Sequence, residues 1–393
     1  MRALDGRKIW FVGIGGAGLS AYATIASAWG AEIGGWDRVH TSYLQPLRAH
    51  EVVIAPEPVV PEGWEVVVSS AYPNVPGKSR AEFLSELVSL RESIVVGGAH
   101  GKTTTTGMIA YVLTQLGRDP AFAIGGEIPQ LGGNAGAGEG WFVVEGDESD
   151  RTIAALRPAV AVVLNVELDH HAEYASLAEL QAVFEEWLSH VPHVVRAEEL
   201  APVDFDLTLA GRHNRLNAAA ALAALELCGV GRDEAQPHIA GYRGAARRFE
   251  LRAEMGGVRV FDDYAHHPTE IAATLATARE QRGARHVLVL FQPHLFTRTR
   301  HLAREFGRAL AAADVVAVTE VYAARETSDD GVAGKLVVDA VSDAHRGVRV
   351  GWMPSAEEGA RWLASLARPG DVVLTVGAGD VDSVVPVLLE ALE

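Results

Sequence analysis

The chain has 393 residues, of which 48% are hydrophobic and 22% charged, so it is long enough to bury two or three separate cores. Its 34 basic and 51 acidic residues give a net charge of −17, which argues against a nucleic-acid partner because phosphate neutralisation needs a basic face. Its single cysteine, Cys228, excludes an intrachain disulfide framework, fits a reducing compartment and lies in an apolar run expected to be core. The first residues lack a signal-peptide core and no apolar run is long enough to span a membrane, so we expect a cytoplasmic protein.

The first stretch of the chain has a Rossmann-like pattern. Its predicted elements are strands at 8–12, 32–36 and 65–69, an alanine-rich helix that follows a glycine turn and ends at Trp29, a helix at 80–90, and a polar, proline-rich loop at 56–64. The first strand runs into Gly13-Ile14-Gly15-Gly16-Ala17-Gly18, a G-x-G-x-x-G turn that can seat a diphosphate on the N-terminus of the next helix. Asp37, at the end of the second strand, either binds a ribose hydroxyl or caps the next element. The pattern indicates nucleotide binding, leaves the kind of nucleotide open, and predicts a boundary near residue 93.

A phosphate cradle is predicted next. The β-branched run at 93–97 indicates a buried strand that leads into Gly98-Ala99-His100-Gly101-Lys102-Thr103-Thr104, where Lys102 and Thr103 open a helix that extends to Leu116. In such a loop, backbone N–H groups face the anion, the lysine adds a charge, and the threonine hydroxyl can hold Mg²⁺. The motif is a shortened G-x-x-G-K-T, because Val96 stands where the strict pattern has its first glycine. The alternative, a glycine-rich turn with an exposed lysine, leaves four consecutive threonines at a helix start unexplained.

Acidic, amide and histidine side chains follow the next two predicted strands. After a glycine-rich loop at 125–140, the strand at 141–144 ends in Glu145-Gly146-Asp147-Glu148-Ser149-Asp150, and the strand at 159–164 ends in Asn165-Val166-Glu167-Leu168-Asp169-His170-His171. The acids of the first run repel one another unless a cation is near, and beside a phosphate cradle that cation is Mg²⁺. The alternative is a solvated acidic turn. Helices are predicted at 177–191 and 218–227, and Asn214 and Asn217 either cap the second helix or contact nucleotide.

Strands and helices alternate from residue 258 onwards, after a hinge-like segment at 244–250, which predicts a second Rossmann-like unit. The predicted strands cover 258–262, 286–291, 315–319, 348–351 and 372–376. Polar clusters follow the first three strands, at 262–270, 292–300 and 320–326, and Gly377-Ala378-Gly379-Asp380 follows the last. Clusters gathered at one sheet edge indicate a substrate face opposing the cradle, and a solvated rim is the alternative.

Taken together, these motifs resemble the Mur ligase family. The matching stretches occur in family order and span nearly the whole chain: 13–18, 98–106, 145–150, 165–170, 211–217, 247–250, 262–270, 291–300 and 321–324. The runs at 263–270 and 291–294 resemble the branch of the family that adds L-alanine. The resemblance implies an α/β fold of three domains: a UDP-sugar-binding Rossmann-like domain at 1–93, a central P-loop ATP-binding domain with a mainly parallel sheet at 94–243, and a Rossmann-like amino-acid-binding domain at 244–393.

The resemblance also implies a reaction and its participants. ATP phosphorylates the lactyl carboxylate of UDP-N-acetylmuramate, and the amino group of L-alanine then attacks the acyl phosphate and releases phosphate. Two Mg²⁺ ions are implied beside ATP, in a cytoplasmic enzyme of peptidoglycan precursor synthesis that is a monomer or a homodimer. Neither a nucleic acid nor a membrane is expected as a partner.

Roles for individual residues follow from the same resemblance. Contacts to the nucleotide are implied for Gly98, Ala99, His100, Gly101, Lys102, Thr103, Thr104, Asn214, Asn217, Arg248 and Asp263. The implied ligands of one Mg²⁺ are Thr103 and Glu145, and those of a second are Glu145 and His170. The UDP pocket is implied for Gly15, Gly16, Gly18, Asp37 and Ser70, and the amino-acid carboxylate for His267 and Arg298. The implied catalytic set is Lys102, Glu145, His170, Asn214, Asn217, Arg248, Asp263, His267 and Arg298.

The chain departs from the family pattern in several places. It lacks a strand-and-helix piece between Ala71 and Arg80 and a sheet segment between His193 and Gly211, and Leu295 stands where some relatives have an arginine. In addition, Asp150-Arg151-Thr152 replaces a run of small residues. Three alternatives to an L-alanine-adding ligase follow: a murein-peptide recycling ligase of the same family, a non-catalytic UDP-sugar-binding remnant, and a nicotinamide dehydrogenase. The last alternative leaves the lysine cradle unexplained.

Overall fold

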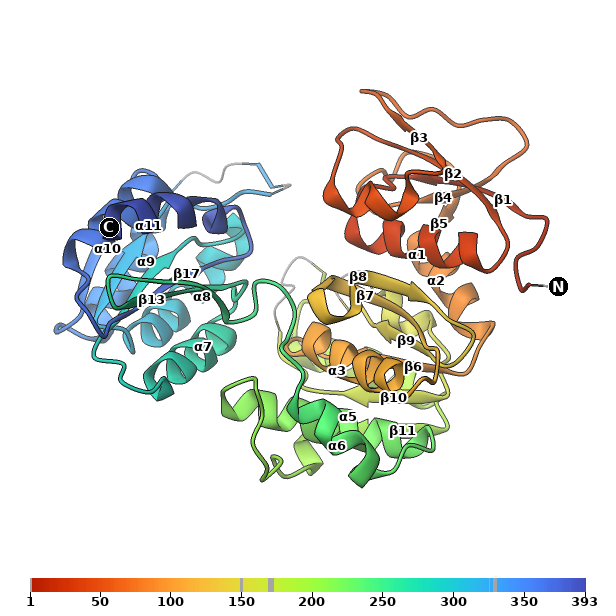
Figure 1. Ribbon diagram of the computed structural model, residues 1–393. Helices are drawn as coiled ribbons and strands as arrows, with labels where there is room; N and C mark the ends of the chain where they lie inside the picture. The colour runs from red at the N-terminus through yellow and green to blue at the C-terminus, as the bar shows by residue number, and fades with distance from the viewer. Residues whose placement is uncertain (1, 149–150, 169–172, 325, 328–330) are drawn as a thin grey trace. The chain divides into compact units, whose positions relative to one another are not determined.

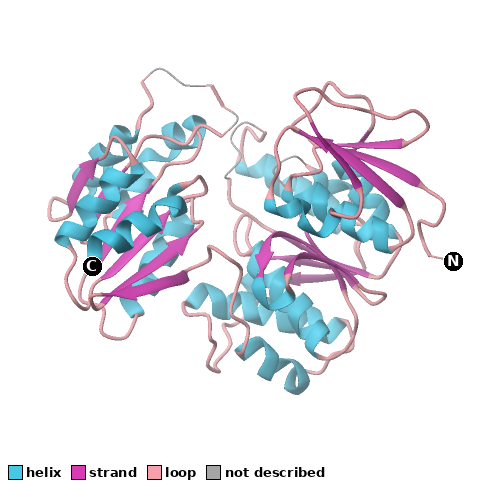
Figure 2. Ribbon diagram, turned by 45° about the horizontal axis from the view of Figure 1, so that its top comes forward, coloured by secondary structure: helices cyan, strands magenta, loops and turns pink. Residues whose placement is uncertain are grey.

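The computed structural model describes residues 2–148, 151–168, 173–324, 326–327 and 331–393, which form two compact units. One unit consists of Met1–Leu168, Glu173–Leu209 and Asn214–Ala245, and the other consists chiefly of Ala246–Glu393. In each unit, strands gather into sheets and helices pack against the sheet faces (Figures 1 and 2). The described strands form three sheets, two in the first unit and one in the second. The predicted α/β fold class is confirmed.

The first sheet carries the predicted glycine turn after its middle strand. Its five parallel strands lie in the order β3-β2-β1-β4-β5, with bounds Lys8–Val12 (β1), Glu32–Asp37 (β2), Glu51–Ile54 (β3), Glu65–Val68 (β4) and Lys78–Ser79 (β5). Helices α1 (Ala17–Ala28) and α2 (Arg80–Ser89) belong to the same part. Ser79 begins α2 with a capping box that Glu82 completes. The sequence analysis missed β3 and β5, which are short edge strands stabilised chiefly by their neighbours.

The second sheet holds the loop with the lysine. Its strands lie in the order β11-β10-β6-β9-β7-β8, with bounds Ser93–Gly97 (β6), Ala121–Ile128 (β7), Gly133–Ala137 (β8), Phe142–Glu145 (β9), Val160–Val163 (β10) and His193–Arg196 (β11). The helices of this part are α3 (Lys102–Gln115), α4 (Leu177–Leu188), α5 (Arg212–Leu227) and α6 (Arg232–Ala240). Because β10, β6 and β9 are parallel neighbours, the residues that follow their carboxyl ends meet at one sheet edge.

The glycine-rich segment at 125–140 corrects the sequence analysis, which predicts a loop there. Much of it belongs to the antiparallel pair β7 and β8, joined by the 3-10 helix η2 (Pro129–Leu131). The glycines allow close packing: a Cβ on Gly136 would lie 2.2 Å from the Phe122 ring, and one on Gly125 would lie 2.9 Å from the Glu145 carboxylate. Glycine at such close approaches removes the side-chain alternation by which a strand is recognised from sequence.

The third sheet makes up the centre of the second unit. Its order is β12-β13-β17-β14-β15-β16, with bounds Glu250–Met255 (β12), Val258–Asp263 (β13), Val287–Phe291 (β14), Val315–Val318 (β15), Arg349–Trp352 (β16) and Val372–Val376 (β17). Its helices are α7 (Pro268–Glu280), α8 (Phe296–Leu310), α9 (Gly334–Ala344), α10 (Ala356–Leu366) and α11 (Val385–Leu392). Pairing is parallel except for β12, an edge strand that the sequence analysis missed. The predicted alternation of strands and helices is confirmed.

Aliphatic side chains fill the interior around each sheet. Every residue of β6, β10, β14 and β17 is buried, which explains why these strands read as continuous apolar runs. Cys228 packs against the core formed by α3, α5 and the second sheet, and burial raises the pKa of its thiol to about 12, as expected for a core residue. None of the described helices combines the length and the apolar character that crossing a bilayer requires.

Candidate active site

The loop between β6 and α3 has the backbone shape of an anion cradle. Gly98 and Gly101 have φ values of 134° and 84°, which residues with side chains rarely adopt. Both also lack room for a side chain, since a Cβ would lie 2.8 Å from the Asn165 carbonyl oxygen at Gly98 and 2.6 Å from the Asn217 amide oxygen at Gly101. The Asn165 side chain accepts a hydrogen bond from His100 N at 2.8 Å and donates one to His100 O at 2.9 Å. Neighbouring elements therefore hold the loop in shape at the start of α3.

Lys102, the first residue of α3, is anchored inside this loop. Its Nζ donates to Gly98 O at 2.6 Å and to both Glu148 carboxylate oxygens at 2.9 Å. The Glu148 side chain is buried, and its backbone carbonyl accepts a hydrogen bond from the Tyr174 hydroxyl at 2.6 Å. Burial acts to lower the pKa of Lys102, but the surrounding carboxylates, Glu148 foremost, outweigh burial and raise it. Lys102 therefore remains a cation at the base of the cradle.

Glu145, at the end of β9, faces the Thr103 hydroxyl. Thr103 Oγ1 donates to the Glu145 oxygens at 3.0 and 3.2 Å, and Gly125 N donates to Glu145 Oε2 at 2.7 Å. A carboxylate and a hydroxyl are the hard oxygen ligands that Mg²⁺ prefers in a phosphate site. The run from Thr103 to Thr106 is buried, so these poor helix formers serve contacts inside the protein.

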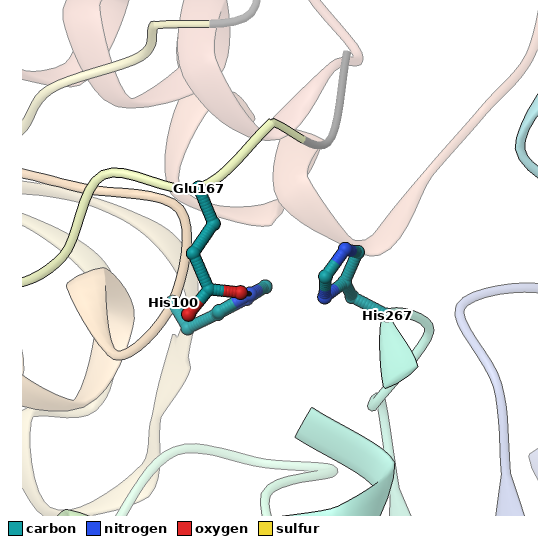
Figure 3. Close-up of side chains that lie close together, drawn as sticks. All are labelled: His100, Glu167 and His267. Carbon is teal, nitrogen blue, oxygen red and sulfur yellow. Dashed lines mark ion pairs between the residues drawn. The ribbon is translucent and has the colours of Figure 1, made fainter. Parts of the chain in front are cut away.

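The residues that follow β10 lie beside the cradle. His100 Nε2 and Glu167 Oε2 are 3.4 Å apart, and Figure 3 shows the two side chains turned toward each other. The predicted metal ligand His170 lies outside the described residues, as do Ser149 and Asp150 of the acidic run. The pairing of Glu145 with His170 stays a prediction.

The two asparagines of α5 lie inside the helix rather than at its cap, because α5 begins at Arg212. Both side chains are buried, and Asn217 Nδ2 donates to Asn214 Oδ1 at 3.3 Å. The Asn217 amide also lies against Gly101, so the structure brings this predicted residue to the cradle.

The predicted UDP-pocket residues gather around the turn after β1. Asp37 Oδ2 accepts a hydrogen bond from Gly15 N at 2.7 Å, and Thr41 Oγ1 donates to Gly15 O at 2.7 Å. Gly16 is the exposed N-cap residue of α1, and Ser70 is exposed in the turn after the neighbouring strand β4. Asp37 therefore shapes the glycine turn directly, a role that the sequence analysis did not assign to it.

Arg80, a residue that sequence reasoning missed, links this turn to the acidic run after β9. Its guanidinium forms an ion pair with Asp147, and its Nη1 lies 3.4 Å from the position of a Cβ on Gly18. The one signal in the sequence is an arginine directly after the capping residue of α2, which is too common to identify a site.

Asp263 organises the predicted cluster at the end of β13. Its carboxylate accepts hydrogen bonds from Phe249 N at 2.8 Å and from Ala265 N at 2.7 Å. Burial raises its pKa to about 6, although Arg248 and the two N–H groups oppose this shift. Arg248 Nη1 lies 3.5 Å from Glu270 Oε1, so the structure brings the predicted Arg248 and Asp263 into one cluster with Glu270.

The predicted amino-acid contacts stand at the starts of the helices that follow β13 and β14. His267 is the N-cap residue of α7, and its Nδ1 accepts a hydrogen bond from Thr269 N at 3.4 Å. Arg298, in the first turn of α8, is buried, with Nη1 3.1 Å from His294 Nδ1. Leu295, the N-cap residue of α8, has a φ of 70°, which is uncommon for leucine. Both predicted residues thus lie at the carboxyl edge of one sheet.

The α/β sheets and the lysine-bearing glycine loop define a multidomain P-loop enzyme. Two family models match, the Mur ligase middle domain over residues 96–198 and the Mur ligase, glutamate ligase domain over residues 247–379. UDP-N-acetylmuramate–L-alanine ligases of Streptomyces coelicolor and Rubrobacter xylanophilus are each 38% identical to this chain, over 97% and 95% of it and 97% of each relative. The crystal structure of the UDP-N-acetylmuramate–alanine ligase of Thermotoga maritima matches with a TM-score of 0.77 and 27% identity over 98% of both chains.

The chain belongs to the Mur ligase family. The predicted enzyme class, a ligase, is confirmed by these full-length relatives. A murein peptide ligase of Psychrobacter arcticus shares the fold, with a TM-score of 0.67 at 21% identity.

Proposed function

We propose that this protein is an ATP- and Mg²⁺-dependent ligase that joins L-alanine to UDP-N-acetylmuramate in peptidoglycan precursor synthesis. The observation that carries the proposal is the anchored cation Lys102 beside the Thr103–Glu145 pair, at the N-terminus of a helix. The choice of substrates is supported by the names of relatives that are 38% identical over nearly the full length. Two deletions relative to the family pattern leave this cradle intact.

Two bond exchanges make up the proposed reaction. A lactyl carboxylate oxygen attacks the γ-phosphorus of ATP, so that an O–P bond forms while the bond to ADP breaks, giving an acyl phosphate. The amino nitrogen of L-alanine then attacks the acyl carbon, a C–N bond forms, inorganic phosphate leaves, and the nitrogen loses a proton. Lys102 and the first N–H groups of α3 stabilise the negative charge of the phosphoryl group during transfer.

The residues around Glu145 fit Mg²⁺. The Glu145 carboxylate lies 3.0 Å from the Thr103 hydroxyl, and the Gly125 N–H group orients it. The carboxylate and the hydroxyl therefore both offer oxygen ligands at the cradle. Thr103 and Glu145 would hold one ion, and Glu145 with His170 would hold a second. When bound, Mg²⁺ neutralises phosphate charge and helps to align the substrate carboxylate.

The remaining assignments place each substrate on its own part of the chain. The glycine turn with Gly15, Gly16 and Gly18, together with Asp37 and Ser70, would bind the UDP moiety. Asn214, Asn217, Arg248 and Asp263 would contact the nucleotide, and His267 and Arg298 the L-alanine carboxylate. We infer domain boundaries near residues 93 and 243, a cytoplasmic location, and a monomer or homodimer.

A turnover assay tests the proposal. The purified protein is incubated with ATP, Mg²⁺, UDP-N-acetylmuramate and L-alanine, and mass spectrometry follows ADP and UDP-N-acetylmuramoyl-L-alanine, with glycine and serine as competing amino acids. We expect stoichiometric ADP, phosphate and amide product. Ligation of a cell-wall tripeptide with no L-alanine product would instead identify a recycling ligase, and UDP-sugar binding without any ligation would identify a non-catalytic remnant.

A further inference from the structure

Arg248 stands between two neighbours whose backbones are held in an uncommon conformation. Arg247 and Phe249 have φ values of 58° and 51°, in the left-handed region that residues with side chains seldom adopt. Phe249 is anchored by its N–H group, which donates to Asp263, and by its ring, which stacks on Phe261 with centroids 4.4 Å apart. Such a backbone persists only where surrounding contacts enforce it, so Arg247 needs an anchor as well.

The guanidinium of Arg247 is that anchor. Its Nε donates to Asp262 Oδ2 at 2.8 Å, its Nη2 to Gly377 O at 2.8 Å, and its Nη1 to Gly379 O at 3.0 Å. The Asp262 side chain is fully buried, and its other oxygen accepts a hydrogen bond from the Thr375 hydroxyl at 2.6 Å. A planar fork matches three acceptors at fixed positions, which the single ammonium of a lysine cannot do. Arg247 thereby ties the segment to the loop that follows β17.

The anchor reaches Arg248 through short contacts. Arg247 N donates to Glu250 Oε2 at 2.9 Å, and Arg247 O accepts a hydrogen bond from Tyr264 N at 2.7 Å. The two guanidinium groups lie over the same Tyr264 ring, 5.1 and 5.3 Å from its centroid. The two adjacent arginines are therefore used differently: Arg247 is bound to backbone carbonyls, the buried Asp262 and Asp382, whereas the guanidinium of Arg248 lies against Glu270.

We propose that Arg247 is a positioning residue for nucleotide binding, which acts by holding the backbone that presents Arg248. The inference rests on the proposed role of Arg248 as a nucleotide contact. Without the guanidinium, the segment loses its tie to the β17 loop and relaxes toward ordinary backbone angles, which displaces Arg248. Affinity for nucleotide then falls, while the glycine turn that binds the UDP moiety is unaffected.

The test compares Arg247→Met, Arg248→Met and the double variant in the full-length protein. Calorimetry with ADP and Mg²⁺ gives nucleotide affinity, and initial rates give separate KM values for ATP and UDP-N-acetylmuramate. We expect Arg247→Met to weaken ADP binding and raise the KM for ATP on the order of tenfold, with the KM for the UDP-sugar unchanged. In the Arg248→Met background the same change should weaken ADP binding by less than about twofold, because residues that act as a unit are not additive.

Two further variants separate positioning from folding. Arg252→Met removes an arginine that is exposed on the neighbouring strand β12 and should leave ADP affinity unchanged. Arg247→Lys and Asp262→Asn keep the size of the side chains and should each weaken ADP binding partially, which remains measurable if Arg247→Met does not fold. Equal loss of ADP affinity in both backgrounds, or no loss with Arg247→Met, would overturn the inference and leave the proposed function standing. No loss with Arg248→Met would instead remove the nucleotide role of Arg248, and the inference with it.

Discussion

Lys102 and the buried Glu148 show how a single ion pair serves two demands. A lysine in the interior remains charged only beside a counter-charge, and both oxygens of Glu148 accept its hydrogen bonds at 2.9 Å. The same ammonium is needed for phosphate charge in the proposed reaction. Stability and catalysis therefore depend on the same side chain and can be separated by changing one partner or both.

Changing Lys102 to Met should reduce kcat by about 10²–10³-fold, because a fixed positive charge at the transferring phosphoryl group is lost. The variant should also lose about 3 kcal/mol of unfolding free energy, since Glu148 keeps a buried charge without its lysine. Adding Glu148→Gln should restore most of this stability and none of the turnover. Phosphate release and urea unfolding measure the two effects, with the exposed Lys335→Met as control. Turnover of K102M at the wild-type rate would show that the site is placed wrongly.

Asp263 should make stability depend on pH. Burial raises the pKa of its carboxyl from 3.8 to about 6, with Arg248 opposing and Glu270 adding to the shift. Between about pH 4 and pH 6 the Asp263 carboxyl is protonated in the folded chain and ionised in the unfolded chain. The free energy of unfolding therefore falls as pH rises through this window and is constant above it. The loss, on the order of 3 kcal/mol relative to Asp263→Asn, is measured by urea unfolding of both proteins across the window. A difference between them that does not change with pH would contradict this account.

Helix α3 is bounded by two glycines that differ in their surroundings. Gly101 and Gly117 have φ values of 84° and 66°, so a side chain is strained at either position. A Cβ on Gly101 would also lie 2.6 Å from the Asn217 amide oxygen, whereas one on Gly117 would meet nothing within 4 Å. The helix is therefore closely packed against α5 at Gly101, whereas a side chain at Gly117 would enter open space.

These surroundings predict different outcomes for the two alanine variants. Gly117→Ala should cost about 1 kcal/mol of stability through backbone strain alone and leave turnover unchanged. Gly101→Ala should cost more and weaken ADP binding at least about tenfold, because the cradle must shift away from Asn217. Thermal unfolding and calorimetric titration with ADP distinguish the two effects. Equal ADP affinities for the two variants would show that the packing at Gly101 is unimportant for the cradle.

The chain as a whole consists of two compact units, each with its own buried core. Units with separate cores can unfold in separate steps, and a ligand stabilises the unit that binds it. The glycine turn and the cradle both lie in the first unit, while the proposed L-alanine contacts lie in the second.

Scanning calorimetry should therefore resolve two transitions. Leu374→Ala, at a fully buried position of β17, should lower the free energy of unfolding of the second unit alone, by about 2–5 kcal/mol. The transition that moves to lower temperature in this variant is then the transition of the second unit. UDP-N-acetylmuramate at a hundred times its Kd should stabilise the other transition by about 2.7 kcal/mol. If the UDP-sugar shifts only the transition that Leu374→Ala affects, the UDP pocket lies in the second unit and the proposed assignment is wrong.

Many of the strands, helices and motifs of this protein can be predicted from short contiguous stretches of its sequence. The run at 93–104 contains a buried strand, two glycines, a lysine and a helix start, and each of these signals depends on residues a few positions apart. The same holds for the glycine turn at 13–18 and for the strands from β13 to β17. The elements missed or misassigned, such as β3, β12 and the pair β7–β8, are edge strands or glycine-rich, and neighbours stabilise them more than their own pattern does.

By itself, the amino-acid sequence determined the fold class, the family and the lysine loop, because these are recorded in local order and spacing. Only the tertiary structure decided which side chains support that loop. The partners of Lys102, His100 and Arg80 lie 46, 65 and 67 positions away, and Arg247 reaches a carbonyl 132 positions away. Parallel sheets bring the ends of distant strands to one edge, so these contacts arise when the chain folds and leave no local pattern to read.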